Sequence, residues 1–271
     1  EWSPLIKIQP SGSKPPLFCV HPAGGGAVCY ADMGRRFAPD QPVYGLQPRG
    51  LEDNLQEPHV TVEDMAACYV TTIQEAGFRE PFQLAGASFG GLVAFEMARQ
   101  FESAGKEVSF VGLLDTYASQ VEQDDDDAGL LWALFEEDID LSLDYLRTLE
   151  PEELLNYVIK QAKDAHLLPP DFGAERFRLI LQMTKISVRA SMHYNPGHYK
   201  GKVVLFRAKG STNENQDNTL GWKDILSENF EVKFVPGSHQ NMFREPHVGV
   251  LVESLKEYMM GERKDTGQVF S

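Results

Sequence analysis

The chain has 271 residues, of which 42% are hydrophobic and 10% aromatic, so its composition excludes global disorder and can supply a large core. Its 25 lysines and arginines face 40 aspartates and glutamates, which gives a formal net charge of −15 at pH 7. Because a polyanion repels phosphate backbones and anionic headgroups, we expect neither nucleic acid nor a membrane surface as a partner.

The cysteine pattern and the chain start indicate where the protein works. Three cysteines, Cys19, Cys29 and Cys68, lack the spacing of a disulfide framework or a zinc site, so we interpret them as buried thiols of a cytoplasmic protein. The longest apolar run, 130–135, is too short to span a bilayer, and the first four residues do not resemble a signal peptide. Since the sequence does not begin with Met, we expect a chain that was processed or cut from a longer one.

Short apolar runs alternate with helical patterns in the first part of the chain. The apolar runs predict buried strands at 17–20, 43–46, 82–85 and 108–114. The spacing of apolar residues predicts helices at 61–76 and 92–101. Strands separated by helices of this length indicate βαβ units, so the predicted class is α/β with a parallel sheet.

The alternation stops after residue 115 and returns after residue 200. Between them lie an acidic run at 124–127, which we interpret as a solvated loop, and helical stretches near 128–137, 151–165 and 173–193. This segment is too long for one crossover and predicts an inserted helical lid. Strands at 203–206 and 230–235 and a helix at 248–259 follow. The expected division is core at 1–115, lid at 116–200, core at 201–260 and a polar tail at 261–271.

One motif with a nucleophilic residue lies between a predicted strand and a predicted helix. Residues 86–90 read Gly-Ala-Ser-Phe-Gly, a G-x-S-x-G pattern at the point where the strand at 82–85 ends. In that setting a serine projects from a strained turn, and glycines two residues away on each side allow the strand and helix to approach closely. We therefore predict Ser88 as a nucleophile; the alternative is an ordinary N-cap serine in a glycine-rich turn.

A serine hydroxyl needs a base to take its proton. His239 directly follows the strand at 230–235, at the carboxyl end of a parallel strand, where α/β active sites form. We predict it as the base, since none of the other six histidines has an equally supportive setting: His21, His59, His166, His193, His198 and His247.

The base in turn needs a carboxylate to orient it. Asp115 ends the strand at 108–114, one βαβ crossover after Ser88, and so should reach the same sheet edge. Asp217 and Glu214, after the strand at 203–206, are alternative acids in a polar segment. We favour Asp115, and the chain order Ser, Asp, His holds in each case.

Attack on a carbonyl also requires N–H donors for the developing oxyanion. The N–H of Phe89, one residue past the nucleophile, is the expected first donor. The second should come from the turn at 21–26, His-Pro-Ala-Gly-Gly-Gly, where Ala23 or Gly24 could donate. A plain loop-forming glycine run is the alternative there.

Several short blocks carry a further signal; they lie at 2–5, 15–25, 86–91, 94–98, 113–116, 237–242 and 246–247. Together they resemble one known family, the type I thioesterase domains that end nonribosomal peptide synthetases and related polyketide synthases. They cover most of the predicted α/β part, whereas the lid has no clear match. The resemblance implies an α/β-hydrolase fold, with a mostly parallel sheet flanked by helices and an inserted lid.

The resemblance also implies residue roles. It favours Asp115 over Asp217 as the acid, and one departure is Ala87, where the family often has a bulkier residue beside the serine. The implied set is a triad with two backbone oxyanion donors: Ser88, Asp115 and His239, with the N–H groups of Ala23 and Phe89.

The implied activity is chain release for natural-product biosynthesis. An upstream carrier domain would present an acyl or peptidyl thioester on its phosphopantetheine, Ser88 would form an acyl-enzyme, and hydrolysis or macrocyclisation would release the product. The domain itself would bind no cofactor and no metal. Two other functions stay open, a free-standing carboxylesterase or lipase and a catalytically silent binding module with the same fold.

Overall fold

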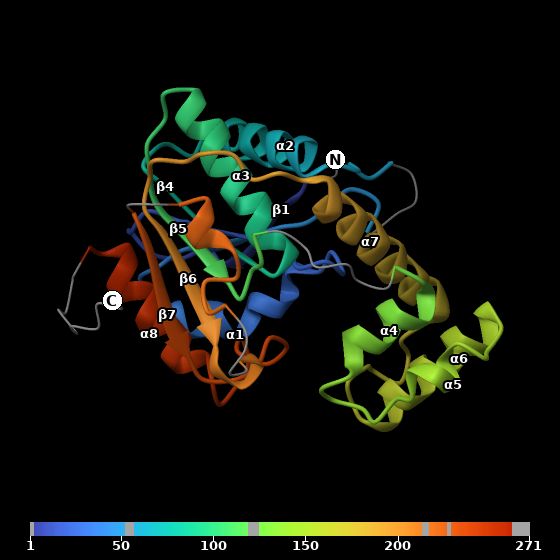
Figure 1. The fold of residues 1–271 in the computed structure, drawn as a ribbon. Helices are drawn as coiled ribbons and strands as arrows, with labels where there is room; N and C mark the ends of the chain where they lie inside the picture. Colours follow the sequence, from blue (N-terminus) through green and yellow to red (C-terminus); the bar gives the residue numbers. More distant parts are fainter. Residues whose placement is uncertain (1–2, 52–56, 119–124, 213–216, 227–228, 262–271) are drawn as a thin grey trace.

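A central sheet carries the fold of this computed structural model, which describes residues 3–51, 57–118, 125–212, 217–226 and 229–261. In those residues the sheet has seven strands in the order β1-β3-β2-β4-β5-β6-β7 (Figure 1). Strand β1 pairs antiparallel with β3, and every other neighbouring pair is parallel. The strands are β1 (Leu5–Gln9), β2 (Leu17–Val20), β3 (Val43–Leu46), β4 (Phe82–Ala87), β5 (Val108–Leu114), β6 (Val203–Ala208) and β7 (Phe230–Val235).

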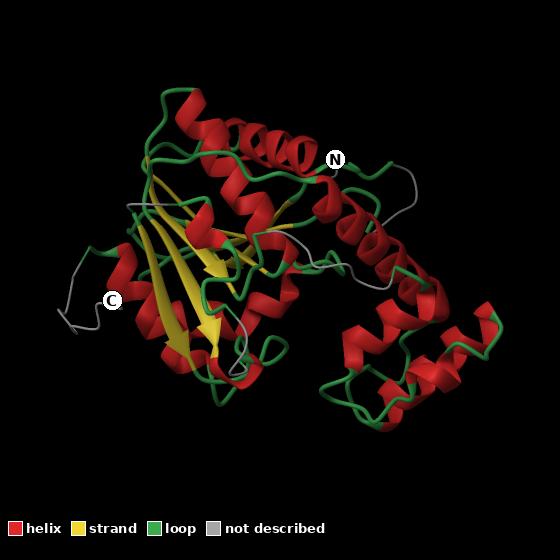
Figure 2. Cartoon of the chain, in the orientation of Figure 1, coloured by secondary structure: helices red, strands yellow, loops and turns green. Residues whose placement is uncertain are grey.

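Helices cover both faces of the sheet (Figure 2). Helices α2 and α3 pack together on one face, and α1 and α8 pack together on the other. The α-helices are α1 (Ala31–Phe37), α2 (Val62–Glu75), α3 (Phe89–Ser103), α4 (Asp127–Phe135), α5 (Leu143–Leu146), α6 (Pro151–Asp164), α7 (Ala174–His193) and α8 (Val248–Met259). Short 3₁₀ turns lie at η1 (Ala27–Tyr30), η2 (Lys209–Ser211) and η3 (Trp222–Asp224).

Each central strand contributes to two hydrophobic cores because its side chains alternate between the sheet faces. In β2, Phe18 and Val20 join the core under α2 and α3, whereas Leu17 and Cys19 join the core under α1 and α8. All four are buried. Burial on both faces is why the parallel strands read as continuous apolar runs. Because these strands run in the same direction, their carboxyl ends lie along one edge of the sheet.

The segment between β5 and β6 forms a helical insertion with its own core. Helices α4 to α6 lie away from the sheet, at the far end of α7 (Figure 1). Helix α7 belongs to both parts, because Phe177 and Leu181 pack in the core of the insertion, whereas Ala190 packs in the core under α3 together with the C-cap residue Tyr194. Helix α7 therefore contacts both the insertion and the core beside the sheet.

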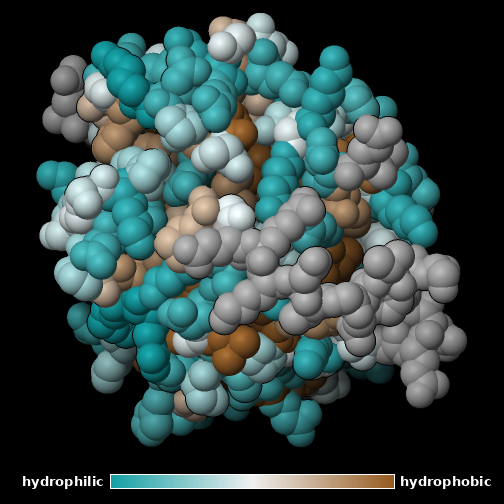
Figure 3. Space-filling model, turned by 90° about the vertical axis from the view of Figure 1, so that its left-hand side faces the viewer, coloured by the Kyte–Doolittle hydropathy of each residue, from teal (hydrophilic) through white to brown (hydrophobic). Residues whose placement is uncertain are grey.

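The molecular surface is mainly polar on the face shown in Figure 3. Hydrophilic residues cover most of that face, with smaller hydrophobic areas between them. This agrees with the 24% of charged residues and the formal net charge of −15.

The predicted fold class, α/β with a mostly parallel sheet and inserted helices, is confirmed. The predicted strands at 17–20, 43–46, 108–114 and 230–235 coincide with β2, β3, β5 and β7, and β4 and β6 each run two residues further than predicted. Strand β1 and helix α1 were not predicted. The domain limits at 115, 200 and 260 stay a prediction, and of the predicted tail, residues 262–271 lie outside the described part of the chain.

Candidate active site

Ser88 lies in a strained turn between β4 and α3. Its φ of 51° and ψ of −123° belong to a region that non-glycine residues rarely adopt. Ser88 occupies the N-cap position of α3, yet its side chain makes no capping hydrogen bond, which argues against the alternative of an ordinary N-cap serine. Its backbone N–H donates to the carbonyl of Leu114 at 2.9 Å, so the turn adjoins the end of β5.

Glycines around Ser88 allow three segments to meet at this turn. A Cβ on Gly86 would collide with the carbonyl of Gly90, and a Cβ on Gly90 would collide with the carbonyl of His21. Only a residue without a side chain fits at either position. The start of α3 is thereby held against the loop that follows β2, which brings together the two predicted sources of oxyanion donors.

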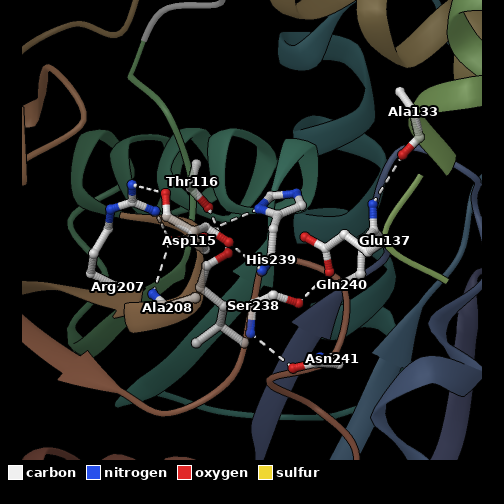
Figure 4. A network of polar contacts seen from close by, with 12 residues as sticks. Asp115, Thr116, Ala133, Glu137, Arg207, Ala208, Ser238, His239, Gln240 and Asn241 are labelled. Carbon is white, nitrogen blue, oxygen red and sulfur yellow. Dashed lines mark hydrogen bonds and ion pairs between the residues drawn. The ribbon is translucent and has the colours of Figure 1, made fainter. Parts of the chain in front are cut away.

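Asp115 and His239 are in direct contact at the carboxyl ends of β5 and β7 (Figure 4). Asp115 Oδ2 lies 2.9 Å from His239 Nδ1, and the carboxylate side chain is 1% exposed whereas the imidazole is 30% exposed. An ionised carboxylate only accepts, so Nδ1 donates and Nε2 is the nitrogen that can take a proton. The other carboxylate oxygen, Oδ1, accepts from the Arg207 guanidinium at 2.5 Å and from the Ala208 N–H at 3.0 Å.

Competing effects set the charge state of Asp115. Burial acts to raise the pKa of its carboxyl. The hydrogen bond from His239 and the charge of its protonated form lower that pKa, as do the hydrogen bonds from the Ala208 N–H and from Arg207. The net shift is downward from the usual pKa of an aspartic acid, so Asp115 is a carboxylate at neutral pH.

The alternative acid Asp217 does not have this geometry. Asp217 accepts hydrogen bonds from the N–H and hydroxyl of Thr219 at 2.9 and 2.6 Å and from the N–H of Gly221 at 2.9 Å. Its carboxylate therefore closes its own turn. Glu214 lies outside the described residues.

The residues on either side of His239 contact the lid (Figure 4). The Ser238 hydroxyl donates to the carboxylate of Glu137, and Gln240 Nε2 donates to the carbonyl of Ala133 at 3.2 Å. Both partners belong to the end of α4 and the turn after it. The loop that carries the imidazole is thus tied to the insertion on both sides, a link that no motif in the sequence indicates.

Two further residues hold the His239 loop in place. The backbone N–H of His239 donates to Ser211 Oγ at 2.7 Å, and the guanidinium of Arg207 donates to the Ser211 carbonyl at 3.1 Å. No sequence pattern indicates a role for Ser211. The one signal for Arg207 is its place inside the otherwise apolar strand β6, because a buried charge requires a partner.

A buried pair of side chains, His21 and Tyr69, holds the start of the loop that follows β2. His21 is fully buried, with Nδ1 2.7 Å from the Pro22 carbonyl and Nε2 2.9 Å from the Tyr69 hydroxyl. Burial lowers the pKa of His21 to about 4, so its ring is neutral at pH 7. Nδ1–H therefore donates to the Pro22 carbonyl, and Nε2 accepts from the hydroxyl of Tyr69.

The predicted oxyanion donors are the N–H groups of Ala23, in this loop, and of Phe89, in the first turn of α3. Phe89 is the first residue of α3 and is buried, so its N–H lies at a helix N-terminus. The carbonyl of Ala23 accepts from Ser187 Oγ on α7 at 3.0 Å, which ties the loop to the long lid helix. The donor roles of the Ala23 and Phe89 N–H groups stay a prediction.

Two of the three predicted triad residues, Asp115 and His239, thus touch, and Ser88 lies at the neighbouring strand end. The catalytic roles of the three stay predictions. Among the described residues, no three His, Cys, Asp or Glu side chains are grouped so that they could hold a metal ion. In the same residues, no helix combines the length and the apolar character needed to cross a bilayer.

Comparison with known proteins points to one family. A family model described as thioesterase domain matches residues 15–257. The chain is 35% identical over 213 residues to a dimodular nonribosomal peptide synthase of Bacillus subtilis (strain 168), covering 75% of this chain and 8% of that protein. It is 26% identical over 261 residues to an atromentin synthetase of Paxillus involutus, covering 92% of this chain and 27% of that protein. Another Paxillus involutus relative, 26% identical over 257 residues, is named an inactive atromentin synthetase.

Solved structures give a consistent result. A four-domain nonribosomal peptide synthetase bound to AMP and glycine matches with a TM-score of 0.82 and 26% identity, over 94% of this chain and 20% of that one. The NocB thioesterase domain, in covalent complex with a fluorophosphonate nocardicin G analogue, matches with a TM-score of 0.70 and 23% identity, over 94% of this chain and 99% of that one; this second likeness shows the fold. Because the family model covers most of its length, the chain belongs to the thioesterase domain family and has the α/β-hydrolase fold of such domains.

Proposed function

We propose that this domain releases an acyl or peptidyl chain from the phosphopantetheine of an upstream carrier domain, with Ser88, His239 and Asp115 as its triad. The observation that carries the proposal is the 2.9 Å hydrogen bond between Asp115 Oδ2 and His239 Nδ1 at the sheet edge where Ser88 lies. This contact leaves Nε2 as the basic nitrogen, as a serine nucleophile requires.

In the first half of the reaction, His239 Nε2 takes the proton of Ser88 Oγ while Oγ attacks the thioester carbonyl. The oxyanion receives hydrogen bonds from the backbone N–H groups of Phe89 and Ala23. The C–S bond then breaks, the pantetheine sulfur takes the proton from the imidazolium, and the chain is left as an ester on Ser88. The Asp115 carboxylate stabilises the imidazolium throughout.

In the second half, His239 Nε2 removes a proton from the nucleophile that attacks the ester carbonyl. The bond between the acyl carbon and Ser88 Oγ then breaks, and the imidazolium returns the proton to Oγ. Water gives a free acid, and a hydroxyl or amine of the chain itself gives a macrocycle. The lid would decide between them by admitting or excluding water, and the contacts of Ser238 and Gln240 with it lie beside the imidazole.

The proposed partners follow from the relatives. The chain spans 8% and 27% of the synthetases described above, so we propose that it works as one domain of a longer synthetase, next to its carrier domain. It would bind no cofactor of its own, because the substrate brings the phosphopantetheine. Cys19, Cys29 and Cys68 are free thiols, which suits a cytoplasmic location.

The proposal is tested with an acyl N-acetylcysteamine thioester and the intact mass of the protein. We expect a Ser88-dependent acyl adduct and product in the wild type and neither in Ser88→Ala. Asp115→Asn should slow product formation by about 10⁴-fold, as the loss of the orienting carboxylate does in serine proteases. Asp217→Asn is the matched control and should stay near the wild-type rate, because Asp217 bonds within its own turn.

Two results would contradict the proposal, and each would favour a different function. Fast cleavage of p-nitrophenyl esters without any reaction of thioesters would favour a general carboxylesterase. Absence of both activities, together with failure of a fluorophosphonate to label Ser88, would favour a silent binding module.

A further inference from the structure

A fully buried arginine lies at the carboxyl end of β6. The Arg207 side chain is 0% exposed, in a strand whose six residues are all buried. Burying a guanidinium is costly unless its charge is paired and its N–H groups find acceptors. One amino group of Arg207 contacts Asp115 Oδ1 at 2.5 Å, and the other donates to the Ser211 carbonyl at 3.1 Å. The side chain thus faces the candidate active site from behind the carboxylate.

The Asp115 carboxylate is held on both sides (Figure 4). Oδ2 accepts from His239, whereas Oδ1 accepts from Arg207 and from the Ala208 N–H. Rotation of the carboxylate would break all three bonds, so the position of the guanidinium fixes the direction in which Oδ2 points.

The same guanidinium also reaches the segment that holds the imidazole backbone. Arg207 donates to the carbonyl of Ser211, and Ser211 Oγ accepts from the N–H of His239. The Arg207 side chain therefore contacts both groups that hold His239: the Asp115 carboxylate, which binds Nδ1, and Ser211, which binds the backbone N–H.

The charge of Arg207 acts on the pair as well. His239 must be neutral in the resting enzyme to serve as a base, and in that state it gives Asp115 a hydrogen bond without a full charge. The guanidinium then supplies the full positive charge in contact with the carboxylate. It keeps the carboxylate ionised, and it offsets part of the negative potential that would otherwise favour protonation of the imidazole.

Other titratable groups lie near the His239 loop, so the contribution of Arg207 must be separated from theirs. On the lid side, Glu136 and Glu137 follow α4, and a charge on His239 acts on Glu136. On the core side, the His247 ring packs against Gly237 before α8. The 3₁₀ turn after β6 adds the exposed Lys209.

We propose that Arg207 is a positioning residue for the Asp115–His239 pair, which orients the carboxylate and sets the pH range in which the imidazole is an effective base. This inference rests on the proposed function. A positioning role differs from a purely structural one because it predicts a change in the pH profile in addition to a change in rate.

The test compares Arg207→Lys, Arg207→Met and the wild type in the full chain. The readouts are kcat/KM with an acyl N-acetylcysteamine thioester from pH 5 to 9 and the imidazole titration of His239 by NMR. In Arg207→Met, we expect kcat/KM to fall by at least 10-fold at pH 7 and the acid limb to move to higher pH by about one unit. Arg207→Lys keeps the charge but loses the two-point contact, so its rate should fall while the limb stays near the wild-type position.

Controls separate the possible outcomes. Arg244→Met removes an exposed arginine from the segment after His239 and should leave rate and profile near those of the wild type. Circular dichroism and Tm establish folding. If Arg207→Met does not fold, Arg207→Lys decides, and an unchanged rate in that variant overturns the positioning role. A folded Arg207→Met whose acid limb and imidazole titration superpose on those of the wild type overturns the inference. The imidazole titration needs no turnover, so a wild type inactive on thioesters would contradict the proposed function without deciding this one.

Discussion

His21 combines complete burial with two specific hydrogen bonds beneath the loop that follows β2. Its Nδ1 lies against the Pro22 carbonyl, its Nε2 lies against the Tyr69 hydroxyl, and its exposed fraction is 0%. Protonation of the ring would replace the acceptor at Nε2 with a second donor, without water to solvate the charge. The residue therefore links the conformation of this loop to the stability of the protein at acidic pH.

This linkage predicts how stability depends on pH. Burial lowers the pKa of His21 in the folded state to about 4, against its usual value of 6.5. Between these values the unfolded chain binds a proton that the folded chain does not, so the free energy of unfolding falls as the pH is lowered from 6.5 to 4. The loss from this residue is about 3 kcal/mol. His21→Gln should remove that part of the pH dependence in urea titrations.

Tyr69→Phe is the control, because it deletes the hydroxyl but keeps the titrating ring and so should retain the pH dependence. Asp115 also has a lowered pKa and adds a loss at more acidic pH, in wild type and variant alike. The difference in unfolding free energy between the wild type and His21→Gln, plotted against pH, therefore isolates the contribution of His21. Parallel curves for the wild type and His21→Gln would contradict the assignment.

The sequence predicts single candidate site residues where they directly follow a strand. Asp115 and His239 each follow an apolar run, and parallel strands bring such positions to one edge. Arg207 and Ser211 could not be assigned this way, because their contacts with Asp115 and His239 join the ends of neighbouring strands and separate loops. The sequence pattern predicts which edge a residue joins, whereas side-chain contacts between strands depend on register and packing.

At the scale of elements, tertiary contacts explain what the sequence patterns missed. Strand β1 is half-buried at the sheet edge and pairs with one neighbour, so it lacks the continuous apolar run of the inner strands. Helix α1 has seven residues and includes Gly34, where a Cβ would press on the side chain of Ile8 in β1. Close packing of these two elements, rather than helix or strand propensity, defines both.

The contact between the His239 loop and the lid is also a property of elements. Gln240 Nε2 donates to the Ala133 carbonyl at the end of α4. A hydrogen bond of this kind contributes about 1 kcal/mol. Gln240→Ala should therefore increase amide hydrogen exchange in residues 127–137 by about fivefold. Exchange in β4 and β5 should not change, because the deleted hydrogen bond is to α4.

Gln74→Ala, at an exposed position in α2, is the matched glutamine control and should leave exchange at 127–137 unaltered. Equal exchange in Gln240→Ala and the wild type would mean that other contacts hold α4. An increase that spread to the sheet would mean that the loop supports the core rather than the lid.

At the scale of the whole molecule, the residues that the structure describes form three hydrophobic cores. Two lie on opposite faces of the sheet, and the third lies within the insertion formed by α4 to α7. Helices α4 to α6 stand away from the sheet, and α7 connects the insertion to the core (Figure 1). An insertion with its own core could move without exposing the cores of the sheet, as the gating proposed above would require.

Two matched leucine substitutions test this separation. Leu146 in α5 and Leu205 in β6 are both 0% exposed, the first in the core of the lid and the second in the core under α2 and α3. Each change to alanine should cost about 2–5 kcal/mol. For Leu146→Ala we expect faster hydrogen exchange in α4 to α6 with the sheet still protected, whereas Leu205→Ala should lower protection throughout.

A small fluorophosphonate should still label Ser88 in Leu146→Ala, because the strand ends keep their positions, but turnover of a long acyl thioester should fall. Loss of protection in lid and sheet together would show instead that they unfold as one unit, and the lid could then move only as a rigid body.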